Sequence, residues 1–155
     1  MLKFSIGIIP VTKKNNQQIW YKKTRSGKKI PFIAPSDRFK KYQEHCAIFI
    51  PNIKDSINVP ITIKAIYYRP DRKVIDLPNL NGALHDVLVH YKVIKDDRCT
   101  IVVSTDGSRV AYSKSNPRTD VEITESDYEC WEVKKKTIDD ILPVKEKKRL
   151  RKVYT

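Results

Sequence analysis

Asp76–Asp97 has the sequence DLPNLNGALHDVLVHYKVIKDD, which predicts a helix followed by an acidic turn. Asp76 suits a helix N-cap, because its carboxylate can accept hydrogen bonds from the first amides of a helix. Pro78 is tolerated in the first turn, where a backbone amide has no intrahelical partner to lose. Apolar residues then recur at spacings of three and four, which predicts one buried stripe. These residues are Leu80, Ala83, Leu84, Val87, Leu88 and Tyr91.

Polar side chains of this predicted helix gather beside the stripe. Asn79 and Asp86 are seven residues apart and so lie on nearly the same side, with Asp76 one turn earlier. A turn after the helix would bring Asp96 and Asp97 back towards that side. Clustered carboxylates repel one another unless a cation neutralises them, and oxygen ligands suit Mg²⁺ or Mn²⁺. The same acids also suit a cap, a solvated helix face and a turn, which are commoner uses of Asp.

Composition favours a polyanionic partner. The 155 residues suggest one domain, and 31 Lys and Arg against 18 Asp and Glu give a net charge of +13. Such an excess most often serves nucleic-acid binding, although it can also serve solubility alone. The three cysteines form no Cys-x-x-Cys pair, so we expect free thiols in a reducing cytosol. Neither a signal peptide nor a membrane-spanning run is evident.

The segment Thr12–Lys41 carries ten basic residues and one acid, with Trp20 and Tyr21 interleaved. It predicts an exposed basic loop or a loose hairpin that includes Lys13 and Lys14. Basic side chains can neutralise phosphates, and an aromatic ring can stack on an unpaired base. The alternative is a solvated, mobile loop that Trp20 anchors, and the sequence favours neither.

The remaining patterns predict strands around a second helix. We expect strands at 2–10, 30–34, 57–68, 99–104 and 119–124, and a helix from 37 to about 50. Asp106–Gly107 is a hairpin signal and predicts a short return strand at 110–114. Together these elements predict an α+β fold in which two main helices pack on a small mixed sheet. We place one domain at 1–125 and a charged extension at 126–155, helical around 145–152 or disordered until it meets DNA.

Six short segments match a known pattern in order and spacing. They are Ile9–Asn15, Asp76–Leu80, Asp86–Leu88, Val93–Asp97, Ser104–Val110 and Asn116–Thr119. In this order they resemble the RusA family of Holliday-junction endonucleases, over roughly residues 2–125. Members of that family are small α+β homodimers, often carried by bacteriophages, that cut branched DNA with a divalent metal held by Asp residues. The resemblance implies Mg²⁺ or Mn²⁺, a 5′-phosphate product and a bacterial cytoplasm.

The resemblance also implies roles for individual residues. The catalytic acids would be Asp76, Asp86, Asp96 and Asp97. The metal ligands would be Asp76, Asn79, Asp86 and Asp97. Phosphate contacts are expected from Lys13, Lys14, Arg69, Arg72, Lys73 and Lys95.

Two residues depart from the family pattern. Pro78 stands where the family has a second Asp, and Gly82 stands where a lysine is common. Asp86 could replace the missing ligand, and Lys73, Lys92 or Lys95 could supply the missing charge. One alternative is therefore a branched-DNA binder with a decayed metal site. Another is a small nucleic-acid-binding protein with no metal site, whose acids are dispersed in the fold.

Overall fold

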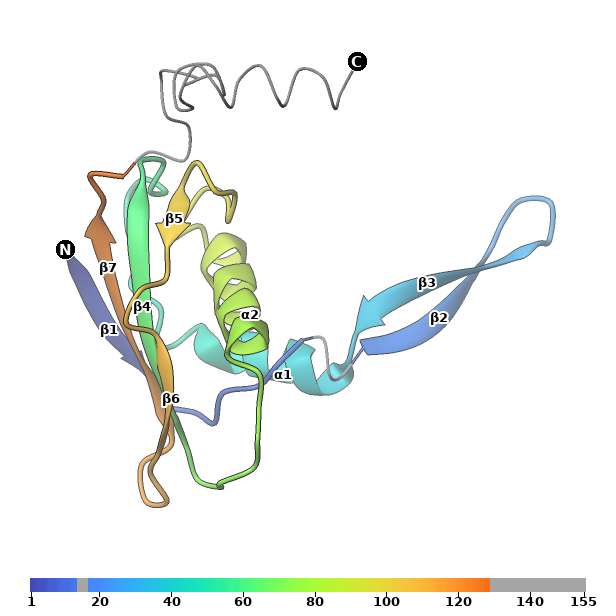
Figure 1. The fold of residues 1–155 in the computed structure, drawn as a ribbon. Helices are drawn as coiled ribbons and strands as arrows, with labels where there is room; N and C mark the ends of the chain where they lie inside the picture. Colours follow the sequence, from blue (N-terminus) through green and yellow to red (C-terminus); the bar gives the residue numbers. More distant parts are fainter. Residues whose placement is uncertain (14–16, 129–155) are drawn as a thin grey trace, which may run out of the picture.

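The computed structural model describes residues 1–13 and 17–128. They form a sheet that two helices cover, and a hairpin that projects from this body (Figure 1). Its strands are β1 (Leu2–Ile6), β2 (Gln17–Lys23), β3 (Lys29–Pro35), β4 (Ile61–Arg69), β5 (Val102–Ser104), β6 (Arg109–Tyr112) and β7 (Arg118–Glu125). Its helices are α1 (Asp37–Cys46) and α2 (Leu77–His90). The hairpin of β2 and β3 extends away from the body.

The five-stranded sheet has the order β1-β7-β4-β5, with β6 also paired to β4. β7 is antiparallel to β1 and β4, whereas β5 and β6 are parallel to β4. A parallel pair needs a crossover connection, and here α2 supplies it between β4 and β5. The prediction of an α+β fold with a mixed sheet and two helices is confirmed.

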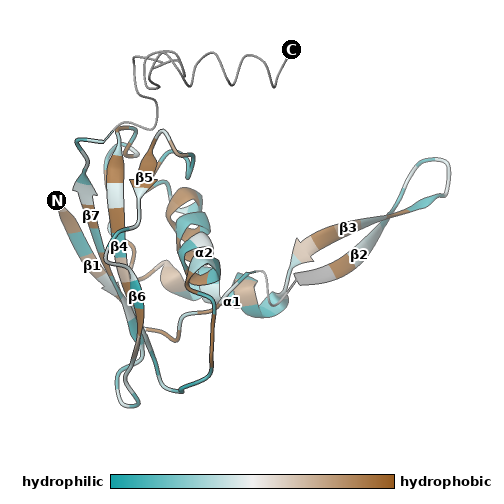
Figure 2. Cartoon of the chain, viewed as in Figure 1, coloured by the Kyte–Doolittle hydropathy of each residue, from teal (hydrophilic) through white to brown (hydrophobic). Residues whose placement is uncertain are grey.

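The core lies between the sheet and the helices. Along β4, Ile61, Ile63, Ala65 and Tyr67 alternate with half-buried neighbours and face inward. They meet the predicted stripe of α2, of which every member but the half-buried Tyr91 is buried. Figure 2 shows apolar bands on both layers. The 3.6-residue and two-residue periods of the sequence therefore identify the buried faces correctly.

Helix α1 begins where expected and ends early. The Ser36 hydroxyl accepts a hydrogen bond from the amide of Phe39 at 3.2 Å and caps the helix. The helix stops at Cys46 instead of continuing to about residue 50. Pro51 explains part of this difference, because a proline disfavours helical geometry at the residue before it.

The predicted hairpin between β5 and β6 is wrong. Both strands run parallel to β4, one after the other, so β6 continues the sheet edge instead of returning along β5. Ser108 bridges the interruption: its hydroxyl accepts from the amide of Ala65 at 3.0 Å and lies 3.3 Å from the carbonyl of Ile63. A local turn signal at Asp106–Gly107 thus marks a break in one edge.

Other boundaries shift by a few residues. β1 ends at Ile6 and β4 begins at Ile61, so the strands expected at 2–10 and 57–68 are shorter than predicted. Most of the extension at 126–155, including the expected helix at 145–152, lies outside the described residues. Neither described helix has the length and apolar character needed to cross a bilayer.

Candidate functional site

Helix α2 starts at the predicted N-cap, but the cap side chain has a different partner. Asp76 makes no side-chain hydrogen bond to a backbone amide of the first turn. Its carboxylate instead accepts from the side-chain amide of Asn79 at 3.1 Å. Asp76 is exposed and lies at the edge of the site, connected to it through Asn79.

The end of α2 turns the chain back on itself. The amide of Lys92 bonds to the carbonyl of Val89, and the amide of Val93 bonds to that of Leu88, with Lys92 at φ 57°. This is a Schellman motif, which satisfies the last carbonyls of a helix and reverses the chain direction. Val93 and Ile94 are then fully buried, and Ile57 pairs with the segment through two backbone bonds. The reversal fixes the position of the acidic pair that follows.

Two adjacent hollows share three charged residues, which are Lys13, Asp86 and Asp97. We call the first the aspartate hollow; its volume is about 280 Å³. It is also lined by Pro78, Asn79, Gly82 and Ala83. The second, of about 300 Å³, extends towards α1 and the base of the hairpin. The fold therefore brings Asp97 from the turn beside Asp86 from α2, as predicted.

Lys13 forms an ion pair with Asp86. The Lys13 Nζ lies 2.8 Å from Oδ2 of Asp86, and both side chains are about one-third exposed, at 36% and 33%. The same ammonium lies 6.0 Å from the centre of the Phe39 ring. The residues after β1 thus deliver a cation to the carboxylates, a contact that no local pattern predicts.

The paired acids after α2 have different surroundings. Asp96 accepts a hydrogen bond from Nε of Arg98 at 2.6 Å, and this bond lowers the pKa of the Asp96 carboxyl. Asp97 is exposed and lines both hollows. The geometry therefore joins Asn79, Asp86 and Asp97, whereas Asp96 is engaged by its neighbour.

His85 is a site residue that the sequence interpretation missed. It lines a further hollow of about 640 Å³, together with Asp97 and residues of β5. Its Nε2 is buried and has no hydrogen-bond partner among the described residues. Burial lowers the pKa of His85 below its ordinary value, while the charges of Asp97 and Asp86 oppose that change. Only its place next to Asp86 in the sequence could have drawn attention to it.

Apart from Lys13, which is paired with Asp86, the predicted phosphate contacts divide into three groups. Lys73 and Lys95 are exposed, and Arg72 is exposed with its guanidinium 4.8 Å from the ring centre of Tyr112. Lys14 lies outside the described residues. Arg69 requires a correction, because it is 8% exposed and its guanidinium bonds to Asp71 and to the carbonyl of Pro10. Arg69 connects β4 to the residues after β1 and is not free to contact a phosphate.

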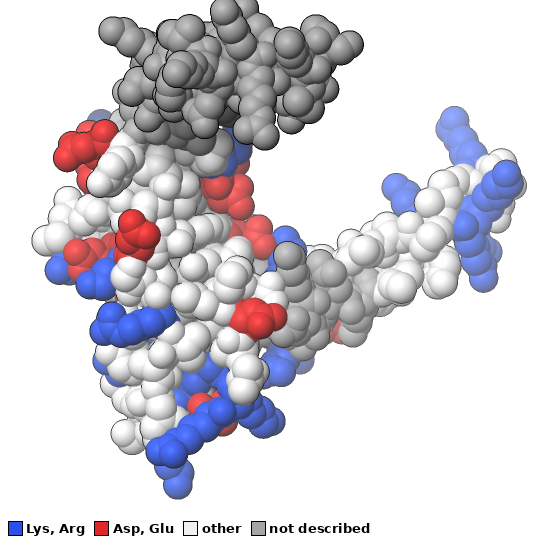
Figure 3. Space-filling model, viewed as in Figure 1, with Lys and Arg blue, Asp and Glu red and all other residues white. Residues whose placement is uncertain are grey.

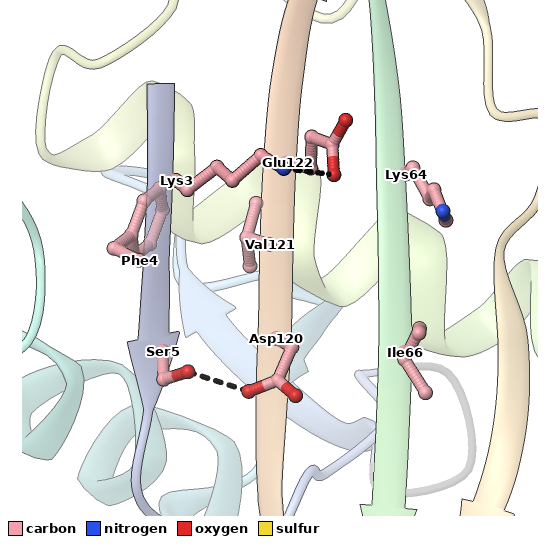
Figure 4. Close-up of a pocket in the computed structure, with 8 residues that line it drawn as sticks. All are labelled: Lys3, Phe4, Ser5, Lys64, Ile66, Asp120, Val121 and Glu122. Atoms are coloured by element: carbon pink, nitrogen blue, oxygen red, sulfur yellow. Dashed lines mark hydrogen bonds and ion pairs between the residues drawn. The ribbon is translucent and has the colours of Figure 1, made fainter. Parts of the chain in front are cut away.

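A separate hollow of about 370 Å³ lies on the sheet face opposite the helices (Figure 4). Three of its four charged lining residues, Lys3, Asp120 and Glu122, have polar partners. Lys3 bonds to Glu122 at 3.1 Å, and Asp120 accepts from Ser5 and from Arg118. None of the predicted site residues lines it, so the aspartate hollow remains the candidate site.

No protein-family model matches the chain, and no curated protein matches it.

Proposed function

We propose that this protein is a metal-dependent endonuclease that nicks branched DNA, a Holliday-junction resolvase of the RusA type acting as a homodimer. One observation carries the proposal. Asp86 on α2 and Asp97 beyond the reversal line the same hollow, beside the amide-bearing Asn79. Oxygen ligands that meet in an open hollow of a strongly basic protein suit a metal ion that also contacts phosphate.

The residues present fit Mg²⁺ or Mn²⁺. No group of three His, Cys, Asp or Glu side chains positioned to hold a metal occurs within residues 1–13 and 17–128. Mg²⁺ does not need one, because it commonly takes one or two carboxylates and completes its shell with water and substrate phosphates. Asp86 and Asp97 would hold the ion, with Asn79 as a further oxygen donor. When bound, the ion lowers the pKa of a coordinated water and neutralises charge on the scissile phosphate.

The chain's own residues would position the DNA. Lys13 lies at the carboxylates and could transfer its ion pair from Asp86 to a phosphate. Exposed Lys73, Lys95 and Arg72 would add phosphate contacts around the site. The hairpin end carries a further group of basic side chains, which Figure 3 shows in blue at its tip. These contacts would supply affinity for DNA, and the two carboxylates would bind the metal ion.

The test is cleavage of a synthetic four-way junction, compared with a linear duplex of the same sequence. We expect paired nicks near the branch that require Mg²⁺ or Mn²⁺ and vanish on addition of a chelator. We expect Asp97→Asn to bind the junction and not to cut it. Metal-independent nicks, or equal cutting of duplex and junction, would contradict the proposal.

A second candidate function is a non-catalytic binder of branched DNA. The Lys13–Asp86 ion pair favours it, because the ammonium already occupies an oxygen that the metal would need. This candidate predicts tight junction binding with no nicks in either metal, and binding that does not depend on Asp97.

A further inference from the structure

The hairpin of β2 and β3, which we call the arm, exposes an unusual amount of apolar surface. We define its shaft as Ile19, Trp20, Tyr21, Ile30, Phe32 and Ile33. Each of these six side chains is between 47% and 69% exposed. We define its tip as Lys22, Lys23, Arg25, Lys28 and Lys29. Figure 2 shows apolar bands on both strands of the shaft, and Figure 3 shows the basic groups confined to the far end.

The register of the two strands places apolar residues on both faces of the shaft. Ile19 is paired with Ile33, and the next pair along, Trp20 with Phe32, points to the opposite face. The shaft therefore has no polar side that would mark one face as permanently solvated.

Within residues 1–13 and 17–128, the body of the protein does not cover this surface. The arm projects away from the sheet and helices, and its strands pair only with each other in the described structure (Figure 1). An isolated two-stranded ribbon is marginally stable in water. Exposed apolar patches of this kind mark surfaces that bind another molecule.

A protein surface suits the shaft better than DNA does. DNA phosphates are bound mainly by cationic side chains, and residues 19–21 and 30–35 contain no Lys or Arg. Stacked bases would use the aromatic rings but would leave Ile19 and Ile33 exposed. The absence of charge on the shaft also means that two basic copies can meet there without bringing like charges into contact.

We propose that the shaft of the arm packs against a second copy of this chain and forms the dimer contact. The six side chains lie on both faces of the ribbon, so the second copy must enclose the shaft to cover them all. Each is about half exposed, and together they then present on the order of 600 Å² per copy if a fully covered large side chain buries roughly 150–250 Å². Two copies would then bury about 1,200 Å², the lower bound of a standard stable interface. The tip, lying beyond the contact, stays available for phosphates. The inference rests on the proposed function only in taking the partner to be a second copy that carries a second site.

The experiment measures oligomeric state by sedimentation velocity and light scattering, with the full chain and without DNA. We expect wild type to have twice the 18.1 kDa chain mass. The shaft variant carries Ile19→Thr, Tyr21→Thr and Ile33→Thr, since Thr retains a high strand propensity. We expect it to dimerise at least about tenfold more weakly, which corresponds to about 1.4 kcal/mol. Circular dichroism would check that it is folded.

The control variant carries Ile48→Thr, Val74→Thr and Tyr128→Thr, which replace exposed apolar side chains outside the arm. We expect it to dimerise like wild type. Amide hydrogen exchange supplies a second measurement that needs no variant, because exchange within residues 19–33 should slow as wild-type concentration rises.

A wild type that stays monomeric at about 100 µM would overturn the inference, because a −8 kcal/mol contact has a dissociation constant of only ~1 µM. A dimer that the shaft substitutions leave unchanged would also overturn it. So would dimerisation that appears only when DNA is added. Junction cleavage is measured separately. A shaft-dependent dimer that never cuts would refute the proposed function and leave this inference standing, whereas a cutting dimer that the shaft substitutions leave unchanged would do the reverse.

Discussion

Lys13 Nζ lies 2.8 Å from Oδ2 of Asp86, although the two residues are 73 positions apart in the sequence. The pair joins the segment after β1 to α2, and Asp97 lines the same hollow. An ammonium at this place neutralises a carboxylate that the proposed function assigns to a metal. A metal ion would therefore compete with the Lys13 ammonium for the Asp86 carboxylate.

Replacing Lys13 by Met should strengthen metal binding in the absence of DNA. The ammonium repels a dication and occupies an Asp86 oxygen, so its removal frees a ligand. Because both side chains are about one-third exposed, solvent screening limits the gain to about 0.5–1 kcal/mol, or roughly two- to fivefold. Isothermal titration with Mn²⁺ would measure it, with exposed Lys95→Met as the matched control. Weaker Mn²⁺ binding by Lys13→Met would show that the lysine supports the site.

Asp96 and Asp97 should differ although they are adjacent. Asp97→Asn removes a carboxylate from the aspartate hollow, and we expect it to lower junction cleavage on the order of 100-fold or more, since even outer-shell partners of a metal contribute 10–100-fold. Asp96→Asn changes a side chain that pairs with Arg98 and does not line the aspartate hollow, so it should retain most of the activity. Rates on one junction at saturating Mg²⁺ make the comparison. Equal losses in both variants would assign the acids a shared role.

Arg69→Ala should destabilise the fold. The substitution leaves the Pro10 carbonyl without its guanidinium donor, and an unsatisfied buried group costs about 1–3 kcal/mol. Arg72→Ala is the control, since its exposed cation–π contact with Tyr112 contributes about 0.5–1 kcal/mol. Urea unfolding followed by circular dichroism would give both values. A smaller effect at Arg69 than at Arg72 would contradict its structural assignment.

Cys46 and Cys99 should react with maleimide at very different rates. Burial raises the pKa of the Cys46 thiol to about 11, so almost none of it is thiolate near pH 8, whereas Cys99 is exposed. Because the folded pKa is raised, the protonated thiol stabilises the fold below its unfolded pKa of 9.0, and this contribution is lost as pH rises towards 11. Peptide mass spectrometry after brief labelling would rank the sites. We expect Cys46 to react only once urea unfolds the protein.

Ser108→Ala should weaken the sheet although Ser108 is only half-buried. Its hydroxyl accepts from the amide of Ala65 and lies within hydrogen-bonding distance of the Ile63 carbonyl, so we expect a loss of about 1–2 kcal/mol. Ser104→Ala removes a hydrogen bond from the exposed amide of Asp106 and should cost less. Thermal unfolding would compare the two variants. Equal midpoints would mean that water replaces the Ser108 contacts.

Local patterns predicted much of the fold. The stripe of α2 and the alternation of β4 follow from periods that each element imposes on its own sequence. The start of α1 and the hairpin arm depend on neighbours within a few residues. For the same reason, the expected proximity of Asp97 to Asp86 needed only a helix and the turn that ends it.

Contacts between distant segments were not predictable in this way. The turn signal at Asp106–Gly107 is real, but pairing with β4 decides where β6 runs, and nothing local records that choice. The buried position of Arg69 depends on Pro10, and the Lys13–Asp86 pair depends on how β1 joins the arm. His85 was missed because its surroundings come from the turn and β5 as well as from α2.

The break between β5 and β6 bears on colloidal behaviour. An unbroken edge strand presents a continuous row of unpaired amides and carbonyls, which can recruit strands from other molecules into aggregates. Here that row is interrupted at 105–108 and Ser108 turns its hydroxyl inward to β4. Aggregation by edge-to-edge strand pairing is therefore disfavoured on this side of the sheet, even at high protein concentration.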